Sequence, residues 1–256
     1  MTILNTIILG FVEGITEFLP ISSTAHLLIA GKLLQIGQTD FFKSFIIIIQ
    51  LGAILAVFLI YIKKIFESKT LWKKITVAWI PTAAIGFLLY QIIKNILFES
   101  LGVIAFAMII GGIIIMIFEK FYKNKNNYIE KVEDISYKKS FWIGLIQALA
   151  VVPGVSRSGA TIIGGMGLGV SRSAIVEFSF LLAIPTIAAA SGYDILKSNT
   201  IIIDGHLLEL SIGFIIAFIS AYLATKFFIK FIKNHSFTSF AIYRIIAGII
   251  ILFFIR

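Results

Sequence analysis

Six long apolar segments alternate along the chain with short polar connections, and their length predicts transmembrane helices. They cover residues 45–62, 75–93, 101–118, 175–196, 207–230 and 240–255. Each is close to the roughly 20 residues that a helix needs to cross the hydrocarbon core of a bilayer. The sequence therefore predicts an all-α polytopic membrane protein with six transmembrane helices, which form a single domain over residues 1–256.

Two further apolar regions, residues 3–33 and 141–170, are interrupted near their middles by polar and helix-breaking residues. The first contains two glutamates, a proline and a run of hydroxyl residues. The second contains a Pro-Gly pair, two serines, an arginine and several glycines. Unpaired backbone groups at membrane depth are tolerated only inside protein or beside a water-filled cavity. We therefore expect each region to form a re-entrant hairpin of two half-helices.

The two broken regions also resemble each other in sequence. The pattern Gly10-Phe11-Val12-Glu13 matches Gly144-Leu145-Ile146-Gln147, and in both cases a proline and then serines follow within seven residues. Each region precedes three spans, so the chain divides into halves at residues 1–122 and 138–256. Since each half crosses the membrane three times, the second must be inverted relative to the first. Inverted-topology repeats with broken helices are common in membrane transporters.

The composition agrees with a protein surrounded by lipid. The chain is 59% hydrophobic and 14% charged, with a mean hydropathy of +1.02, whereas soluble domains contain about 25% charged residues. The absence of cysteine excludes a disulfide framework, a thiolate metal site and a thiol nucleophile. The net charge is +9, and the basic residues that produce it lie in short loops between apolar spans. This placement favours anionic lipid headgroups over nucleic acid as the partner.

The distribution of the basic residues predicts the orientation. In the six-span arrangement, fifteen lysine and arginine residues fall on one side of the membrane and five on the other. The positive-inside rule places the larger group in the cytoplasm, so both termini face outward. The polar segment 119–140 is then the cytoplasmic link between the halves.

Glu13 and Glu17 are four residues apart on the first half-helix, so their carboxylates lie on one face about one turn apart. Two like charges in a poorly solvated place repel unless a proton or a cation lies between them. The pair predicts a divalent-cation site or an acid–base pair, and the alternative is a pair near the outer interface that reaches water. Ionisable residues inside membranes are functional candidates by default, which favours the first interpretation.

The hydroxyl run Ser22, Ser23 and Thr24 opens the second half-helix of the first broken region. Pro20 precedes the run, and His26 falls in the first turn of the helix. Hydroxyl residues cap helix N-termini in any protein, and a lone histidine is more often structural than catalytic. A helix start inside the membrane also presents free N–H groups and a positive dipole end, which attract an anion. Both interpretations stay open.

The segment from Pro153 to Thr161 repeats this arrangement from the opposite side. Gly154 allows close backbone approach, and Ser156 and Ser158 supply hydroxyl groups. Arg157 offers a planar fork suited to phosphate, and it is one of only four arginines in the chain. The alternative for Arg157 is a buried structural ion pair with a glutamate. Together, two helix starts, hydroxyls, an arginine and a carboxylate pair at one depth predict a site for a phosphorylated ligand.

Other polar residues in the apolar segments carry less information. Gln50 and Gln147 are expected to form hydrogen bonds within the bundle. Four charged residues lie toward the ends of spans, where we expect them to be interfacial or paired: Glu177, Asp194, Glu209 and Arg244.

The two motifs resemble the signature motifs of the undecaprenyl-diphosphatase (bacitracin-resistance) family. They run from Glu13 to His26 (EGITEFLPISSTAH) and from Pro153 to Thr161 (PGVSRSGAT). Residues 49–52 (IQLG) and 178–185 (FSFLLAIP) resemble further family segments, so the resemblance covers essentially the whole chain.

The resemblance implies a phosphatase of the bacterial plasma membrane. Such an enzyme hydrolyses undecaprenyl diphosphate to undecaprenyl phosphate and inorganic phosphate. This reaction recycles the lipid carrier of peptidoglycan synthesis, supports cell shape and confers bacitracin resistance. The resemblance also implies a divalent cation (Mg or Ca) and a polyprenyl diphosphate lipid as the substrate, and it is compatible with a homodimer.

The family's functional residues carry over by position. Its metal-binding glutamates fall on Glu13 and Glu17. The residues assigned to catalysis are Glu17, Ser22, Ser23, His26 and Arg157, and those assigned to substrate binding are Thr24, Gly154, Ser156, Arg157 and Ser158.

This chain departs from the family pattern at two positions. Many members carry a glutamate four residues before the glutamine of the IQLG segment, where this chain has Ile46. If that glutamate binds metal in relatives, the metal here must rest on Glu13 and Glu17 alone. Ala25 replaces a glycine that is common before the histidine.

These residues suggest a mechanism in which the cation and Arg157 bind the diphosphate oxygens, since phosphoryl transfer depends mostly on positioning and charge neutralisation. His26 could act as a general base for water or for a serine, or attack phosphorus itself. The prenyl tail would leave the site sideways between helices, and the site would open to the outer face. The competing function is a transporter or flippase of polyprenyl phosphate lipids. A purely structural scaffold leaves the buried charges unexplained.

Overall fold

The computed structural model describes the whole chain apart from residues 38, 93–99, 123–127, 198–204 and 255–256, and the described part is helical. Its elements are α1 (Ile3–Thr16), α2 (Ser23–Leu33), α3 (Asp40–Glu67), α4 (Lys69–Ile92), α5 (Leu101–Phe121), η2 (Val132–Asp134), α6 (Tyr137–Gln147), η3 (Ala148–Val151), α7 (Arg157–Gly167), α8 (Arg172–Lys197), α9 (Leu207–Ile232) and α10 (Thr238–Phe254). The prediction of an all-α membrane protein is confirmed.

Each of the six predicted spans falls within one continuous helix, although residues 93 and 255 lie outside the described part. The six helices are α3, α4, α5, α8, α9 and α10. Of the described helices, α3, α5, α8 and α9 are long and apolar enough to cross a membrane, and α1 and α10 are shorter apolar helices. Their hydrophobic residues are exposed on the outside of the bundle, as expected for helices that face lipid.

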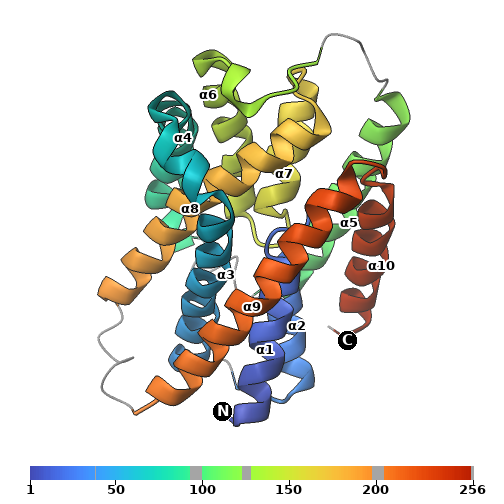
Figure 1. Ribbon diagram of the computed structural model, residues 1–256. Helices are drawn as coiled ribbons and strands as arrows, with labels where there is room; N and C mark the ends of the chain where they lie inside the picture. Colours follow the sequence, from blue (N-terminus) through green and yellow to red (C-terminus); the bar gives the residue numbers. More distant parts are fainter. Residues whose placement is uncertain (38, 93–99, 123–127, 198–204, 255–256) are drawn as a thin grey trace.

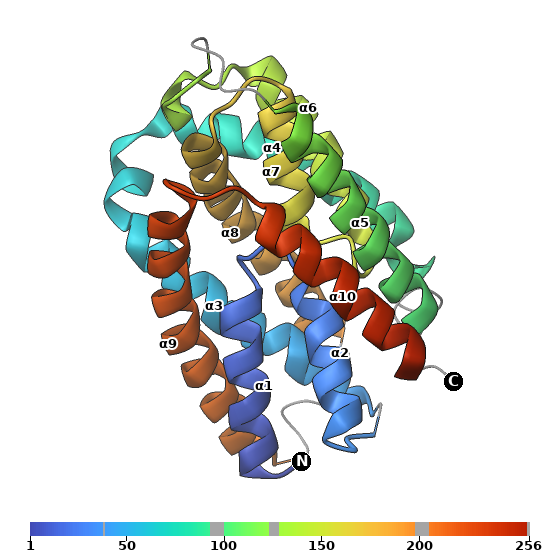
Figure 2. The same cartoon turned by 90° about the vertical axis from the view of Figure 1, so that its right-hand side faces the viewer.

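The two broken regions form helical hairpins that enter the molecule from opposite ends (Figure 1). The hairpin of α1 and α2 begins near the N-terminus, and the hairpin of α6 and α7 begins at the far end. Their turns meet in the middle of the molecule in both views (Figure 2). The Ser158 hydroxyl donates a hydrogen bond to the Leu19 carbonyl at 2.8 Å and so joins one turn to the other.

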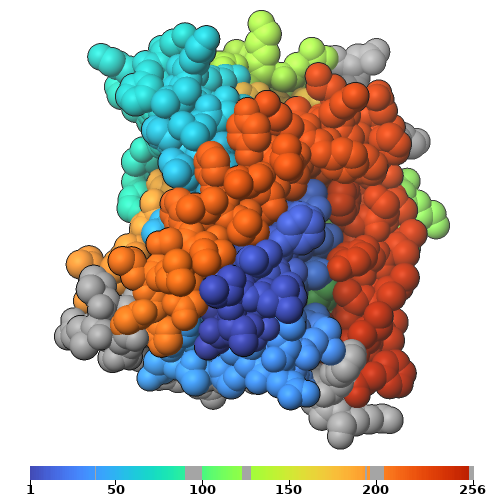
Figure 3. Space-filling view, turned by 60° about the horizontal axis from the view of Figure 1, so that its bottom comes forward, coloured from blue at the N-terminus to red at the C-terminus, as the bar shows by residue number. Residues whose placement is uncertain are grey.

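The first half-helix of each hairpin packs against a helix from the other half of the chain, α1 on α9 and α6 on α4. In Figure 3 the surface of α1 lies directly beside that of α9. Glycines allow both crossings, because a Cβ at Gly10 would lie 2.7 Å from the Gly213 carbonyl oxygen and one at Gly144 would lie 1.7 Å from the Ala78 oxygen. Small residues at helix crossings let backbones approach closely, as is common in membranes.

A hydroxyl side chain of the opposite half lies beside the glycine carbonyl at each crossing. The Thr82 hydroxyl on α4 donates to the Gly144 carbonyl at 2.7 Å. The Ser220 hydroxyl on α9 lies 3.4 Å from the Gly10 carbonyl oxygen and donates at 2.7 Å to the Ile216 carbonyl of its own helix. The sequence similarity between the hairpins therefore corresponds to similar packing of each one against the opposite half.

The start of α1 and the end of α10 lie toward one end of the molecule, and the described connections with most of the basic residues lie toward the other (Figures 1 and 2). At the basic end, Lys64 contacts Glu133 at 2.7 Å and Glu177 at 2.5 Å, and Arg172 contacts Glu119 at 2.5 Å. Glu177 is thus paired, as predicted. The grouping of the basic residues at one end follows from the fold, whereas the side of the membrane that this end faces is not determined by it.

Candidate active site

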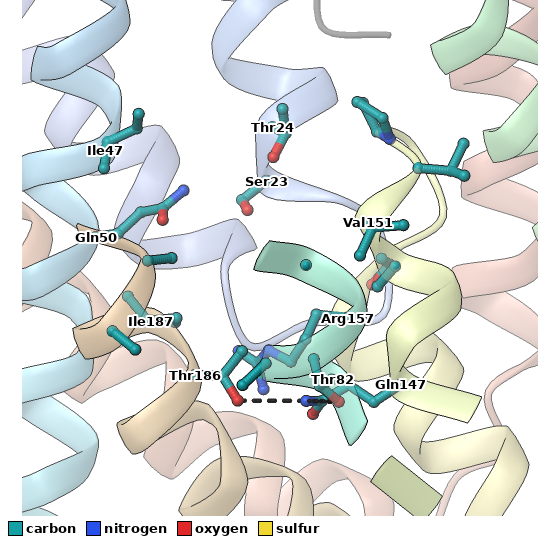
Figure 4. Close-up of a pocket in the computed structure, with 18 of the residues that line it drawn as sticks. Ser23, Thr24, Ile47, Gln50, Thr82, Gln147, Val151, Arg157, Thr186 and Ile187 are labelled. Carbon is teal, nitrogen blue, oxygen red and sulfur yellow. Dashed lines mark hydrogen bonds between the residues drawn. The ribbon is translucent and has the colours of Figure 1, made fainter. Parts of the chain in front are cut away.

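A cavity of about 530 Å³ lies where the two hairpin turns meet α3, α4 and α8. Figure 4 shows side chains from all of these elements pointing into it. Its polar lining consists of Glu17, Ser22, Ser23, Thr24, Gln50, Thr82, Gln147, Ser156, Arg157, Thr186 and Tyr193. Most of the residues that the two motifs predicted for the site therefore share one cavity.

Arg157 and Glu17 form an ion pair in the wall of the cavity, with 3.0 Å between Nη2 and Oε1. The Ser23 hydroxyl donates to the other oxygen of Glu17 at 2.5 Å. Arg157 also donates to the Ser179 carbonyl at 3.0 Å. The pairing of Arg157 with a glutamate, which was the alternative to phosphate binding, does occur. Because the pair lines an open cavity, it does not exclude contact with a ligand.

Phe18, next to Glu17 in the chain, packs beside Arg157. It is 1% exposed and its ring lies edge-on against Phe180 of α8, with 5.4 Å between the ring centroids. The guanidinium carbon of Arg157 lies 5.6 Å from the same ring centroid, within the range of a cation–π contact. Phe18 therefore connects α8 to the arginine of the ion pair.

The helices α2 and α7 both begin at the cavity, and their first residues follow serines with unusual backbone conformations. Ser22 has φ of 70° and Ser156 has φ of 73°, a region that residues other than glycine seldom adopt. The Ser156 hydroxyl accepts from the Gly159 N–H at 3.1 Å and caps α7. Ser22 makes no such side-chain cap. The start of α2 therefore lies at the cavity without a side-chain cap from Ser22, and uncapped helix N-termini attract anions.

Three predicted site residues lie outside the cavity lining: Glu13, which is described below, His26 and Ser158. The Nδ1 atom of His26 lies 2.7 Å from the Ser22 carbonyl oxygen, and its Nε2 atom lies 2.6 Å from the Tyr243 hydroxyl. Ser158 is buried and bonds to the opposite turn. His26 thus contacts the backbone of the site, and Ser158 holds the two turns together.

Glu13 is completely buried, and neither of its carboxylate oxygens has a hydrogen-bond partner. It lies one helical turn before Glu17 and behind the cavity lining. An unpartnered buried carboxylate is costly, and oxygen ligands are those that Mg²⁺ and Ca²⁺ prefer. The two glutamates fit a cation that takes its other ligands from phosphate or water. The described residues contain no cluster of three or more His, Asp or Glu side chains that would complete a protein-only site.

Ile46, the position where the family resemblance implies a glutamate in many members, is 1% exposed and belongs to an apolar cluster with Phe42, Phe45 and Ile49. It does not line the cavity, to which α3 contributes Ile47 and Gln50. The side chain at position 46 therefore supplies packing in this chain.

A network of buried polar side chains around Gln147 forms part of the cavity wall. The Gln147 amide donates to Thr82 at 3.1 Å and to Thr186 at 3.3 Å, and its carbonyl accepts from Thr161 at 3.1 Å (Figure 4). The prediction that Gln147 bonds within the bundle is confirmed. Threonine is common in apolar helices, so of these residues only Gln147 indicated a polar site from the sequence.

The expectation that Arg244 is interfacial is wrong. Its side chain is 0% exposed and donates to backbone carbonyls of both hairpin turns. It lies one residue after Tyr243 in the middle of α10, so position along the span gave no sign of this role. Glu209 contacts His206 at 3.5 Å, as expected for a paired residue, and the side chain of Asp194 is outside the described part.

The rest of the cavity is apolar and extends between α4 and α8. Its walls include Ala83 and Gly86 from α4 and Ala189 and Ala190 from α8. Phe87 and Tyr193 meet across the two helices, with 6.0 Å between ring centroids. The cavity therefore joins a polar end at the hairpin turns to an apolar end lined by small residues.

Comparison with known proteins identifies the family. A family model described as bacitracin resistance protein BacA matches residues 6–250. The chain belongs to this family. The undecaprenyl-diphosphatase of Wolinella succinogenes is 49% identical over 255 residues, which are 100% of this chain and 99% of the relative. That of Persephonella marina is 48% identical over 255 residues, 100% of both chains, and that of Aquifex aeolicus is 48% identical over 250 residues, 98% and 97% of the two chains.

Membership in the bacitracin resistance family confirms the resemblance that the two motifs suggested. The match includes both hairpins and the helices that complete the cavity. The relatives named undecaprenyl-diphosphatase align with essentially the whole chain, including the segments that line the cavity.

Proposed function

We propose that this chain hydrolyses undecaprenyl diphosphate to undecaprenyl phosphate and inorganic phosphate. The observation that carries the proposal is the Arg157–Glu17 pair in a cavity where two helices begin. The full-length identity to relatives named undecaprenyl-diphosphatase supports the same reaction. The reaction would recycle the lipid carrier of cell-wall synthesis and confer bacitracin resistance, as the family's description implies.

Arg157 and the helix starts account for binding of the diphosphate. Its oxygens carry negative charges that repel an incoming nucleophile, so catalysis depends on neutralising and positioning them. Arg157 lines the cavity with its Nη2 bound to Glu17 and its Nη1 bound to the Ser179 carbonyl. The N–H groups at the start of α2, with Ser22, Thr24 and Ser156, supply further donors on the cavity wall.

Glu17 and Ser23 are the best placed pair for the attack on phosphorus. The Ser23 hydroxyl already donates to Glu17, so Glu17 can accept a proton from Ser23 or from a water molecule at the same place. His26 remains a candidate base or nucleophile from the sequence motif, but its ring nitrogens face Ser22 and Tyr243. The geometry favours Glu17 as the general base.

Glu13 and Glu17 would hold a divalent cation, Mg or Ca. The unpartnered oxygens of Glu13 support this assignment. When bound, such a cation would neutralise charge on the diphosphate oxygens. It would also remove the repulsion between the two carboxylates, which are one helical turn apart.

The opposed entry of the two hairpins supports a proposed arrangement in the membrane. We place six helices across the bilayer and the two hairpins as re-entrant elements of an inverted-topology repeat with halves 1–122 and 138–256. The basic end is assigned to the cytoplasm of a bacterial cell by the positive-inside rule. Both termini and the opening of the site then face outward.

The polyprenyl tail would leave the cavity between α4 and α8, where the walls are apolar and small. The hydrophobic end of the cavity supports this path, because the tail must stay in lipid while the diphosphate occupies the polar end. A homodimer is a further prediction from the family resemblance.

Lipid transport is the second candidate, and the opposed hairpins favour it because broken helices that meet near the midplane are typical of transporters. The fold cannot choose between the two functions. The carboxylate pair favours hydrolysis, since two glutamates would hinder phosphate binding without a cation.

The deciding experiment measures phosphate release from undecaprenyl diphosphate by the purified protein in detergent, with and without a chelator. Wild type, Glu17→Gln and Arg157→Ala are compared, with Arg172→Lys as a control arginine that pairs with Glu119 away from the cavity. We expect cation-dependent release that both site variants lose and the control keeps. Absence of release from folded wild type with Mg²⁺, Ca²⁺ or Mn²⁺ would contradict the proposal and direct attention to lipid movement in sealed vesicles.

A further inference from the structure

Arg244 connects three segments of the chain through main-chain hydrogen bonds. It lies in the middle of α10 and is completely buried. Its Nη1 donates to the Pro20 carbonyl at 3.1 Å, and its Nη2 donates to the Gly154 carbonyl at 3.0 Å and the Ala107 carbonyl at 3.2 Å. Its Nε donates to the Met108 carbonyl at 3.4 Å. One guanidinium therefore ties both hairpin turns to α5.

Within the described residues, Arg244 has no carboxylate within ion-pairing distance, in contrast to the partly buried Arg157 and Arg172. A buried charge without a counter-ion is expensive. A lysine presents its donors from a single point and cannot form a planar fork. The specific geometry of the guanidinium, rather than its charge alone, therefore accounts for an arginine at this position.

The two turn carbonyls that Arg244 binds are equivalent positions in the hairpins. Pro20 lies two residues before Ser22, and Gly154 lies two residues before Ser156. Both serines have φ near 70° and precede the helices that begin at the cavity. Arg244 is thus placed where it fixes the separation of the two helix starts.

Two glycines provide the space for the guanidinium. A Cβ at Gly111 of α5 would lie 2.2 Å from Nη2 of Arg244, and a Cβ at Gly159 of α7 would lie 3.1 Å from Nη1. Side chains at these positions would displace the fork. The close fit indicates a single position for the guanidinium.

We propose that Arg244 is a positioning residue that holds the two helix starts at the spacing required for one diphosphate to bind both. The residues that line the cavity do not include Arg244, so it acts through the Pro20 and Gly154 carbonyls. The proposal rests on the proposed function, because the diphosphate is the ligand for which the spacing is set.

The test moves the Arg244 guanidinium without removing it. Gly111→Ala places a methyl group against the Arg244 guanidinium. Gly102→Ala, on the same helix, meets only the Ser100 hydroxyl at 3.9 Å and serves as the matched control. Both changes replace glycine by alanine within α5, so neither lowers helix propensity. Arg244→Lys keeps the positive charge and removes the fork.

Two readouts are measured on purified protein in detergent: kcat and KM for undecaprenyl diphosphate, and the rise in melting temperature on adding inorganic pyrophosphate. We expect kcat/KM to fall about 100-fold in Gly111→Ala and Arg244→Lys, the loss expected from a misplacement of about 1 Å. The pyrophosphate-induced rise should shrink in both, and Gly102→Ala should match wild type in both readouts.

Wild-type kcat/KM and an unchanged pyrophosphate response in folded Gly111→Ala would overturn the proposal, whether or not Arg244→Lys folds. A wild type that responds to pyrophosphate but releases no phosphate would contradict the proposed function, and the response of Gly111→Ala would still decide the role of Arg244.

Discussion

The guanidinium of Arg157 lies 3.0 Å from the carboxylate of Glu17, although the two residues are 140 positions apart in the chain. Each comes from a different hairpin, and the hairpins enter the molecule from opposite ends. The pair is largely buried, with side chains 12% and 8% exposed. It therefore links the stability of the hairpin contact to the chemistry of the cavity.

Removing one partner of this pair should affect stability and activity together, whereas removing both should separate the two effects. Glu17→Gln or Arg157→Met leaves an uncompensated charge, with an expected cost of about 3–5 kcal/mol in unfolding free energy. The double variant should regain much of this stability and remain inactive. Thermal denaturation and phosphate release of all four proteins measure this. An active double variant would show that catalysis requires neither Glu17 nor Arg157.

The contacts of His26 predict that it acts through the Ser22 backbone and together with Tyr243. If so, His26→Gln and Tyr243→Phe should lower kcat by similar factors. The kcat of the double variant should be no lower than that of the less active single variant. A direct role of His26 as base or nucleophile would instead give a loss of about 10²–10⁴-fold for His26→Gln alone. The kcat values of the three variants, with Tyr222→Phe as a control on α9, separate these outcomes.

Glu13 should control the response to a divalent cation. Its oxygens lack partners, so Glu13→Gln should raise the melting temperature of cation-free protein by relieving an unpaired buried carboxylate. The same change should weaken cation affinity at least ~10-fold. Melting temperature is measured over a series of MgCl₂ and CaCl₂ concentrations after chelation. An unchanged cation dependence in Glu13→Gln would show that the site does not use Glu13.

The path of the prenyl tail can be blocked at Gly86. This glycine lines the cavity and has open space around its Cβ position, so Gly86→Trp should be accommodated while filling the path between α4 and α8. We expect kcat/KM for undecaprenyl diphosphate to fall ~10-fold or more, because the indole ring would exclude the tail from this path. A tenfold loss corresponds to a binding penalty of about 1.4 kcal/mol. Hydrolysis of a short-chain analogue such as farnesyl diphosphate should change little.

Gly192 provides the control for that experiment. It lies on α8, has equally open space around its Cβ position and is not part of the cavity lining. Gly192→Trp should hydrolyse both substrates like wild type. Equal losses on long and short substrates in Gly86→Trp would place the tail elsewhere.

The sequence by itself determined the helices and the breaks between them. Apolar runs of the length of a bilayer must form helices, because backbone groups in lipid have no other partners. Glu13, Pro20 and Arg157 interrupt such runs, and so they marked the hairpins before any contact was known. The two motifs also contained most of the cavity's charged and hydroxyl residues, since the chemistry of a phosphate site requires those residue types.

Only the tertiary structure decided which of these residues meet. The internal repeat predicted two opposed hairpins, but only the packing of their turns brings Glu17 and Arg157 to 3.0 Å. His26 belongs to the first motif and yet contacts Tyr243, because its place on α2 turns it from the cavity toward α10. Arg244 was expected to be interfacial or paired near the end of a span, and instead it binds both turns. Its partners are backbone carbonyls, which are the same in every residue, so the sequence could not reveal them.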